Sequence, residues 1–341
     1  MRRKLIAIIG GVVVLSVVFL IAFGNTVFGW RVVTFTDKNF EAVVRNSLRM
    51  PSGDLRQKDL RNILYISNMT DRLRTSSDKI QDISPVQYMT NLEWLILHRS
   101  EISDISALYG LTNLTFLHLS FNNISDISAL YGLTNLTLLD LSFNNISDIS
   151  ILSELTSLTE IDLTTNTIKD ISALRDLTNL TELRAWNNNI CDVTAVQGLT
   201  NLEYLALGVN EINDLNALQG LTNLTELLLD NNNVSDITAL QGLINLERLG
   251  IANNEISDIT AVQGLTKLRR LYLSDNKISD ISVLKELTNL EWLFLDNNEI
   301  SYTSILAEMT NLITLSLKGN PISDDDIQAL RYALPNTDIR H

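Results

Sequence analysis

A unit of 22 residues repeats along most of the chain. The period is regular from Leu92 onward, and the unit over residues 111–132 reads LTNLTFLHLSFNNISDISALYG. Ten full units and a truncated eleventh exclude a chance match. One column of the repeat is held by asparagine: Asn122, Asn144, Asn166, Asn188, Asn210, Asn232, Asn254, Asn276, Asn298 and Asn320. Because a unit this short cannot bury its own apolar face, neighbouring units must stack, and the repeat predicts an elongated solenoid.

Each unit contains a short alternation of apolar and other residues. In the unit above, Leu117 and Leu119 alternate with Phe116, His118 and Ser120. Since side chains alternate between the two faces of a strand, we expect the leucines to face inward and the other three residues to face outward. Eleven such strands, stacked in parallel about 4.8 Å apart, would form a curved sheet about 48 Å long.

The remaining columns of the repeat predict turns. At the asparagine column the chain turns away from the strand while the side chain stays buried. We therefore expect the asparagine amides to form hydrogen bonds with main-chain groups of their own and neighbouring coils. An aspartate column can cap short 3₁₀ turns on the convex side by accepting backbone N–H groups. It comprises Asp104, Asp126, Asp148, Asp170, Asp192, Asp214, Asp236, Asp258 and Asp280. A glycine column predicts a turn with positive φ at Gly110, Gly132, Gly198, Gly220, Gly242 and Gly264.

The unit L-T-N-L-T-x-L-x-L-x-x-N-x-I-S-D-I follows the leucine-rich repeat pattern and resembles the 22-residue repeat of the internalin family of bacterial surface proteins. The resemblance covers about residues 32–341 and includes residues 33–48, which are similar to the helical N-terminal cap of that family. It implies an α/β solenoid. This fold is a right-handed superhelix with short parallel strands on its concave face and a helical cap at each end.

Both ends of the array carry helix signals. Residues 40–48 place apolar side chains on one helical face behind Asp37, a good N-cap residue. Ser323 and the aspartates after it predict a second helix over residues 324–334. The predicted organisation has four parts. A membrane-targeting segment at residues 1–30 is followed by a helical cap and a degenerate first coil at residues 31–91, with an insertion near residues 70–77. Eleven repeats, the last truncated, occupy residues 92–320, and a C-terminal cap occupies residues 321–341.

The first residues are typical of a membrane-targeting segment. Arg2, Arg3 and Lys4 precede an uncharged, largely apolar stretch over residues 5–23. Its 19 residues exceed the roughly 7–15 of a cleavable signal peptide and reach the roughly 20 that span a bilayer. This length favours an uncleaved signal-anchor over a cleaved signal peptide, and both stay open. In either case the positive-inside rule predicts that the rest of the chain lies outside the cytoplasm, in the cell envelope.

Composition argues against several kinds of partner. The formal net charge of −14 and the pI near 4.6 argue against a nucleic-acid partner, because phosphate binding needs a basic surface. One cysteine and three histidines are too few for a disulfide scaffold or a Cys/His metal cluster. We therefore expect no metal and no cofactor, and we expect a monomer.

Aromatic residues are scarce and unevenly placed. After Phe40, every tryptophan and phenylalanine falls on or beside an outward strand position, where exposed rings are typical of interface anchors. The predicted ligand-binding aromatic residues are Trp94, Phe116, Phe121, Phe143, Trp186, Tyr204, Tyr272, Trp292 and Phe294. An N-terminal apolar cluster contains Trp94, Ile96, Phe116, Phe121, Leu138 and Phe143, and a C-terminal one contains Tyr272, Trp292 and Phe294. Charged residues lie between them, among them Asp140, Asp162 and Arg184.

Apolar anchors on either side of a charged band predict a protein ligand on the concave face. The resemblance likewise implies a bacterial cell-surface or secreted protein that recognises another protein. One alternative is that neighbouring rings only stack on one another across the strands. Two others are binding of cell-wall or host polysaccharide, and a structural role in the envelope without a specific ligand.

One column also invites a catalytic interpretation. His118, Asp140, Asp162 and Arg184 occupy the same position in four consecutive units, so their side chains are expected to be neighbours about 5 Å apart. A hydrolase or metal site there would need more than one histidine with two carboxylates, because a nucleophile, an oxyanion hole and a pocket are missing. We therefore predict a solvated row of charges and no enzymatic activity.

Overall fold

The computed structural model of the protein describes residues 31–69 and 79–341. The predicted membrane-targeting segment at residues 1–30 and the predicted insertion near 70–77 lie outside the described residues. Within the two described ranges, no helix has both the length and the apolar character that crossing a membrane requires. The targeting segment, the domain boundaries and the location outside the cytoplasm therefore stay predictions.

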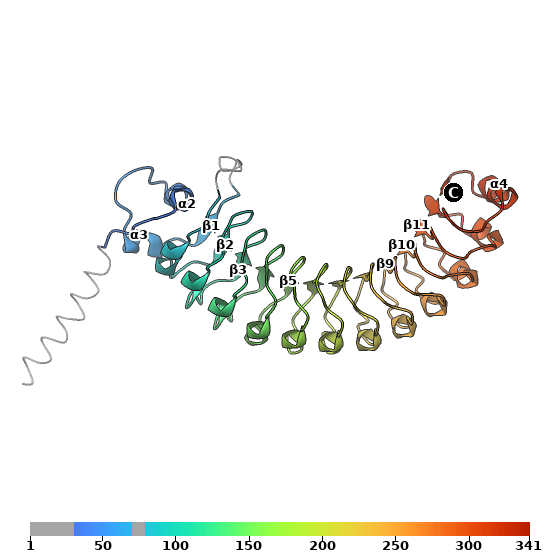
Figure 1. The fold of residues 1–341 in the computed structure, drawn as a ribbon, viewed down its shortest axis with the longest axis horizontal. Coiled ribbons are helices and arrows are strands. Elements are labelled where there is room, and N and C mark those ends of the chain that lie inside the picture. Colours follow the sequence, from blue (N-terminus) through green and yellow to red (C-terminus); the bar gives the residue numbers. More distant parts are fainter. Residues whose placement is uncertain (1–30, 70–78) are drawn as a thin grey trace, which may run out of the picture.

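Thirteen short parallel strands in the described part of the chain form one open sheet, in which each strand pairs with the next one along the sequence (Figure 1). The chain forms an arch with the strands on its inner side and the 3₁₀ turns on its outer side (Figure 1). The predicted solenoid fold is thus confirmed, with one strand more at each end than the eleven expected. The strands are β1 (Tyr65–Ser67), β2 (Trp94–Ile96), β3 (Phe116–His118), β4 (Leu138–Asp140), β5 (Glu160–Asp162), β6 (Glu182–Arg184), β7 (Tyr204–Ala206), β8 (Glu226–Leu228), β9 (Arg248–Gly250), β10 (Arg270–Tyr272), β11 (Trp292–Phe294), β12 (Thr314–Ser316) and β13 (Asp338–Arg340).

From β2 to β12 the register of the sheet follows the 22-residue period without a shift. Phe116 pairs with Leu138, and Leu117 pairs with Leu139, each 22 residues further along. Equivalent residues therefore form straight rows across the strands. We call the outward residues at the first strand position the first row and those at the third position the second row. The middle residue of each strand points inward, as at Leu117, which is completely buried in a continuous aliphatic core.

Short 3₁₀ turns line the convex side, and the aspartate column caps them as predicted. The backbone N–H of Ser128 donates to Asp126 Oδ1 at 2.8 Å, and this bond recurs in the other units of the column. It lowers the pKa of the Asp126 carboxyl below its ordinary value. The turns are η1 (Ser84–Tyr88), η2 (Ser106–Leu108), η3 (Ser128–Leu130), η4 (Ser150–Glu154), η5 (Ser172–Leu174), η6 (Thr194–Val196), η7 (Asn216–Leu218), η8 (Thr238–Leu240), η9 (Thr260–Val262), η10 (Ser282–Glu286) and η11 (Ser304–Glu308).

The asparagine column forms a buried ladder that ties adjacent coils together, as predicted. The Asn122 amide donates to the carbonyl of Leu97 at 2.8 Å in the preceding coil and to that of Leu119 at 2.9 Å in its own coil. Its side-chain oxygen accepts from the backbone N–H of Ile102 at 3.1 Å. The same three bonds recur at the later positions, for example at Asn232 and Asn298.

Two columns adopt left-handed backbone, and the sequence predicted only one of them. Five of the six glycines predicted to have positive φ do so, whereas Gly198 does not. The second column lies one residue before the asparagine ladder, and we call it the turn row. Its residues from Arg99 to Asn297 have φ between 51° and 60°. None of them is glycine, so composition alone gives no signal for the conformation. The turn-row residues are Arg99, Phe121, Phe143, Thr165, Asn187, Val209, Asn231, Asn253, Asp275 and Asn297.

Helices cover both ends of the array. Asp37 caps α2 (Lys38–Leu48) by accepting from the backbone N–H of Phe40 at 2.9 Å, and its other oxygen accepts from Gln81 at 2.6 Å, which joins the helix to the first coil. A short helix, α3 (Gln57–Arg61), follows and was not predicted. At the far end Ser323 caps α4 (Asp324–Ala333), which ends one residue earlier than expected.

Candidate interaction surface on the concave face

The N-terminal end of the first row is an aromatic stack. Trp94 lies against Phe116 with ring centroids 4.8 Å apart and an interplanar angle of 8°. Tyr65, on β1, continues the stack at 6.5 Å from Trp94 and is a ligand-binding candidate that sequence reasoning missed. Trp94 keeps 45% of its surface exposed despite these neighbours. Ile96 was predicted to join this cluster but is only 8% exposed, so it offers little surface to a ligand.

Phe121 and Phe143 lie beside the strands, in the turn row. Their rings stack at 4.0 Å with an interplanar angle of 7°, and the Arg99 guanidinium lies 5.2 Å from the Phe121 centroid. Left-handed backbone costs a residue with a Cβ roughly 1–2 kcal/mol. Both rings also stay exposed, so the fold carries two conformationally unfavourable residues at exposed positions.

The C-terminal aromatic cluster is interleaved with arginines. Tyr272 and Phe294 stack at 5.2 Å in the second row. Arg248 lies over the Tyr272 ring at 5.5 Å, and Arg270 lies over the Trp292 ring at 4.8 Å. Tyr272 and Phe294 are therefore brought together as predicted, whereas Trp292 lies in the first row against Arg270. Cation–π contacts with arginine hold two of the rings in place.

Ring stacking, one of the alternatives to ligand binding, is thus observed for three pairs of aromatic residues. It does not account for Trp186, whose indole has no stacking partner among the described aromatic residues. A Cβ placed on Gly208, in the next coil, would overlap three carbons of the Trp186 ring. The absence of a side chain at Gly208 therefore lets the half-buried indole lie across the neighbouring strand.

We expect Gly208→Ala to displace the Trp186 ring, because an added methyl group and the indole cannot occupy the same space. The cost is about 1–3 kcal/mol, typical of an overpacked site. Fluorine NMR of 5-fluorotryptophan-labelled protein would show a shifted Trp186 resonance, and urea denaturation would show the lost stability. Gly198→Ala is the matched control, because Gly198 has ordinary φ and nothing within 4 Å of the added Cβ. An unmoved Trp186 resonance in Gly208→Ala would contradict this packing.

The register places His118, Asp140, Asp162 and Arg184 side by side, as the period predicts. His118 Nε2 lies 3.1 Å from Asp140 Oδ2. Asp162 accepts from the backbone N–H of Thr164 at 2.9 Å, yet burial raises the pKa of its carboxyl.

Arg184 does not face Asp162 alone. It forms an ion pair with Glu182 at 2.6 Å and covers the Tyr204 ring at 4.7 Å. The ring centroid of His98 lies 5.7 Å from that of His118, and burial together with His118 lowers the pKa of His98.

The charged band brings carboxylates next to one another. Within residues 31–69 and 79–341, no three His, Cys, Asp or Glu side chains gather closely enough to hold a metal ion. Like charges meet directly at Asp140 and Asp162 and at Glu160 and Glu182, an arrangement that destabilises a sheet by itself. A partner with positive charge over this band would offset that repulsion.

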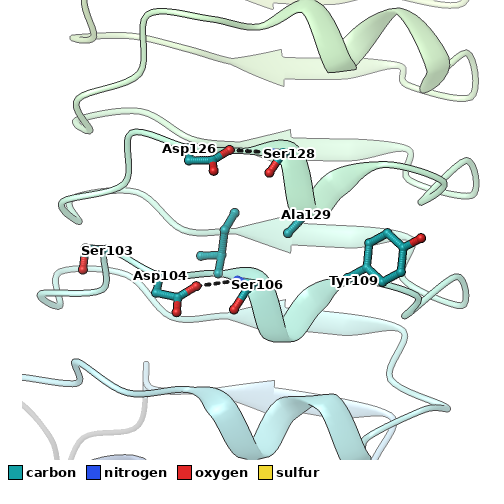
Figure 2. A pocket seen from close by; sticks show the side chains of 8 residues that line it. Ser103, Asp104, Ser106, Tyr109, Asp126, Ser128 and Ala129 are labelled. Atoms are coloured by element: carbon teal, nitrogen blue, oxygen red, sulfur yellow. Dashed lines mark hydrogen bonds between the residues drawn. The ribbon is translucent and has the colours of Figure 1, made fainter.

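The convex side also carries open grooves between coils. One of them has a volume of about 520 Å³. Figure 2 shows Tyr109 at one end of this groove and the carboxylates of Asp104 and Asp126 at the other. Each carboxylate accepts a backbone N–H two residues on at 2.8 Å, from Ser106 and Ser128 (Figure 2). The two carboxylates of this groove are thus engaged in capping the turns, a structural role.

Comparison with known proteins places these observations in a family context. Residues 90–132, 134–176, 222–263 and 244–286 match the family described as Leucine Rich repeats (2 copies), and residues 191–234 and 308–330 match two further leucine-rich repeat families. An internalin, InlF, of Listeria monocytogenes is 35% identical, over 90% of this chain and 95% of that one, with a TM-score of 0.74. No curated protein matches the chain.

Two further solved structures share the architecture. A leucine-rich repeat protein of Leptospira interrogans is 27% identical, over 76% of this chain and 74% of that one, with a TM-score of 0.69. The leucine-rich repeat ectodomain of a plant membrane receptor kinase from Arabidopsis thaliana, in complex with Casparian strip integrity factor 2, is 23% identical, over 70% of this chain and 31% of that one, with a TM-score of 0.65. The likeness to the plant receptor is one of fold alone.

Proposed function

Because the chain belongs to the internalin-like leucine-rich repeat family, we propose that it is an extracytoplasmic module that binds a protein ligand on its concave face. One observation carries the proposal. All seven tryptophan and phenylalanine residues of the range 79–341 lie on the outward strand rows or in the turns that follow. Exposed rings confined to one side are typical of an interaction surface.

The layout of charge supports a protein partner over a saccharide. Carboxylates of Asp140, Glu160 and Asp162 lie between aromatic residues at both ends, and arginines follow from Arg248 onward. A protein can match an acidic band and a basic band at once, whereas a neutral polysaccharide matches neither. The plant receptor ectodomain, which has the same fold, is in complex with a named factor, and this supports ligand recognition by such an array.

Location outside the cytoplasm rests on the sequence of the N-terminal segment. The basic residues 2–4 and the apolar stretch 5–23 would direct export, and an uncleaved segment would hold the module at the membrane.

The test compares three forms of the chain as capture reagents. The concave variant changes Trp94, Trp186 and Trp292 to alanine. The outer variant changes Tyr109, Tyr131 and Tyr302 to alanine, because these exposed tyrosines lie outside the strand rows. We expect one protein to be retained by the wild type and the outer variant and lost by the concave variant, with all three equally folded by circular dichroism. Equal retention by all three forms, or a glycan as the only saturable ligand, would refute the proposal.

A further inference from the structure

The turn row carries large side chains only near its N-terminal end. Arg99, Phe121 and Phe143 occupy three consecutive coils with φ of 51°, 55° and 55°. From Asn231 onward the same row contains only Asn and Asp, which tolerate left-handed backbone. The coil does not require Arg or Phe at these positions. A retained unfavourable residue at an exposed position indicates a use other than folding.

The three side chains form an ordered stack. The Arg99 guanidinium lies 5.2 Å from the Phe121 centroid, and the Phe143 ring lies 4.0 Å from it at an angle of 7°. Since the residues come from consecutive coils, the guanidinium and the Phe143 ring cover opposite faces of Phe121. The edges of the rings therefore remain for contact, with 40% of Phe121 and 39% of Phe143 exposed. Ring edges carry the positive part of the aromatic quadrupole.

A second cation completes the site. The Lys79 ammonium donates to the backbone carbonyl of Arg99 at 3.1 Å, and both residues line the same cavity. These residues line an open cavity of about 440 Å³ together with Asn122 and Asn123. Across the described residues, the Arg99 side chain has no acceptor for its N–H groups and no ion pair. In a chain with a formal net charge of −14, this is a local concentration of positive charge with donors available.

We propose that the Arg99–Phe121–Phe143 stack, with Lys79, binds the side-chain carboxylate of an Asp or Glu residue in the protein ligand. The guanidinium offers a planar pair of N–H donors that fits a carboxylate, and stacking on Phe121 holds that plane in place. The inference rests on the proposed function, because it names one group of the partner that covers the concave face. The site lies at the rim of that face, beside β2 and β3.

A single carboxylate fits this site better than a polyanion. Two cations over three coils match one acidic group, and the row of carboxylates that begins at Asp140 would repel the continuing charges of a sulfated glycan. An acidic residue within an otherwise uncharged stretch of polypeptide meets no such repulsion. The exposed ring edges would contact an apolar side chain next to it.

The experiment titrates short probes into the full chain labelled with ¹⁵N-arginine, and it follows the Nε–H resonance of Arg99. The main probe is acetyl-Asp-Phe-amide, and its neutral counterpart is acetyl-Asn-Phe-amide. We expect saturable binding of the acidic probe and at least tenfold weaker binding of the neutral one. Two further probes test other sources of an anion. One is acetyl-Asn-Phe with a free C-terminal carboxylate, and the other is a sulfated heparin disaccharide. Both are expected to bind more weakly than the acidic probe.

Two variants and one control separate the site from general electrostatics. Arg99→Gln should weaken binding of the acidic probe at least tenfold. Phe121→Asn should do the same while leaving the urea midpoint unchanged or higher, because asparagine suits the left-handed turn that phenylalanine occupies. The control is Arg331→Gln, which removes an exposed arginine of α4 at the far end of the array and should leave binding unchanged.

Equal affinity for the Asp and Asn probes, or unchanged binding in Phe121→Asn, would overturn the proposed site. Tighter binding of the free C-terminus or of the disaccharide would overturn the assignment to an acidic side chain. These results are distinguishable from failure of the proposed function, since small probes report on the stack without any protein partner. Loss of partner capture in the concave variant tests that function separately.

Discussion

Replacing Asn232 by alanine should lower the free energy of unfolding by about 3–5 kcal/mol, the largest stability effect expected of a single polar residue in the array. The amide donates to the carbonyls of Leu207 and Leu229 at 3.1 and 2.9 Å, and its oxygen accepts from the N–H of Ile212 at 3.0 Å. Alanine leaves these main-chain groups without the buried partner that replaced water, and each such loss costs about 1–3 kcal/mol. Urea denaturation followed by circular dichroism measures the change.

The adjacent Asn233 is the matched control. Its side chain is exposed and has no hydrogen bond among the described residues, so Asn233→Ala should change stability by less than about 0.5 kcal/mol. Asn232→Asp keeps the size and one acceptor but directs a second oxygen at the two carbonyls. It should therefore be at least as destabilising as alanine at neutral pH. A urea midpoint equal to that of the wild type for either Asn232 variant would show that the asparagine ladder contributes little to stability.

Replacing Trp94 by alanine should weaken the affinity for the captured partner roughly 30- to 1,000-fold. This factor corresponds to about 2–4 kcal/mol of binding free energy for a tryptophan anchor. Trp94 is stacked on Phe116 at 4.8 Å, so its orientation is set before binding, and 45% of its surface remains to be covered. Preorganised, large and exposed rings contribute most to protein interfaces because little rotamer entropy is lost when they bind. Surface plasmon resonance with the identified partner measures the affinity.

The size of the effect should follow how much of each ring is free. Trp186 is half-buried and already lies across Gly208, so Trp186→Ala should weaken binding less than Trp94→Ala. Tyr302 is the control, because it is 73% exposed in the column of the capping aspartates, on the convex side. Tyr302→Ala should leave affinity unchanged. A larger loss of affinity in Tyr302→Ala than in Trp94→Ala would show that the interaction surface does not lie on the concave face.

Much of the fold follows from the period. A regular 22-residue repeat puts equivalent residues in register, so the pairing of Leu117 with Leu139 and the row from His118 to Arg184 were predictable. The buried asparagine ladder and the aspartate caps were predictable for the same reason, since each recurs once per coil and has a clear bonding requirement. The aromatic residues of the candidate surface were found because the period assigns every residue to a row.

The parts that were missed depend on contacts that the period does not encode. Tyr65 joins the Trp94 stack although the two residues are 29 apart, because the first coil departs from the repeat length. The left-handed turn at Phe121 contains no glycine at the positive-φ position, so the sequence pattern does not predict it. His98 contacts His118 diagonally between rows. Such contacts depend on side-chain rotamers and on how one coil packs against the next.

The sequence by itself determined the solenoid, the row that each residue occupies and the side of the arch on which the aromatic residues lie, because a constant period leaves only one way to stack the coils. The tertiary structure alone decided which side chains in neighbouring rows touch. It showed that Trp186 lies over Gly208 and that Arg99, Phe121 and Phe143 form one stack. The physical reason is that backbone hydrogen bonds set the register, whereas diagonal contacts follow from coil curvature, left-handed turns and ring orientation, which vary within an unchanged repeat.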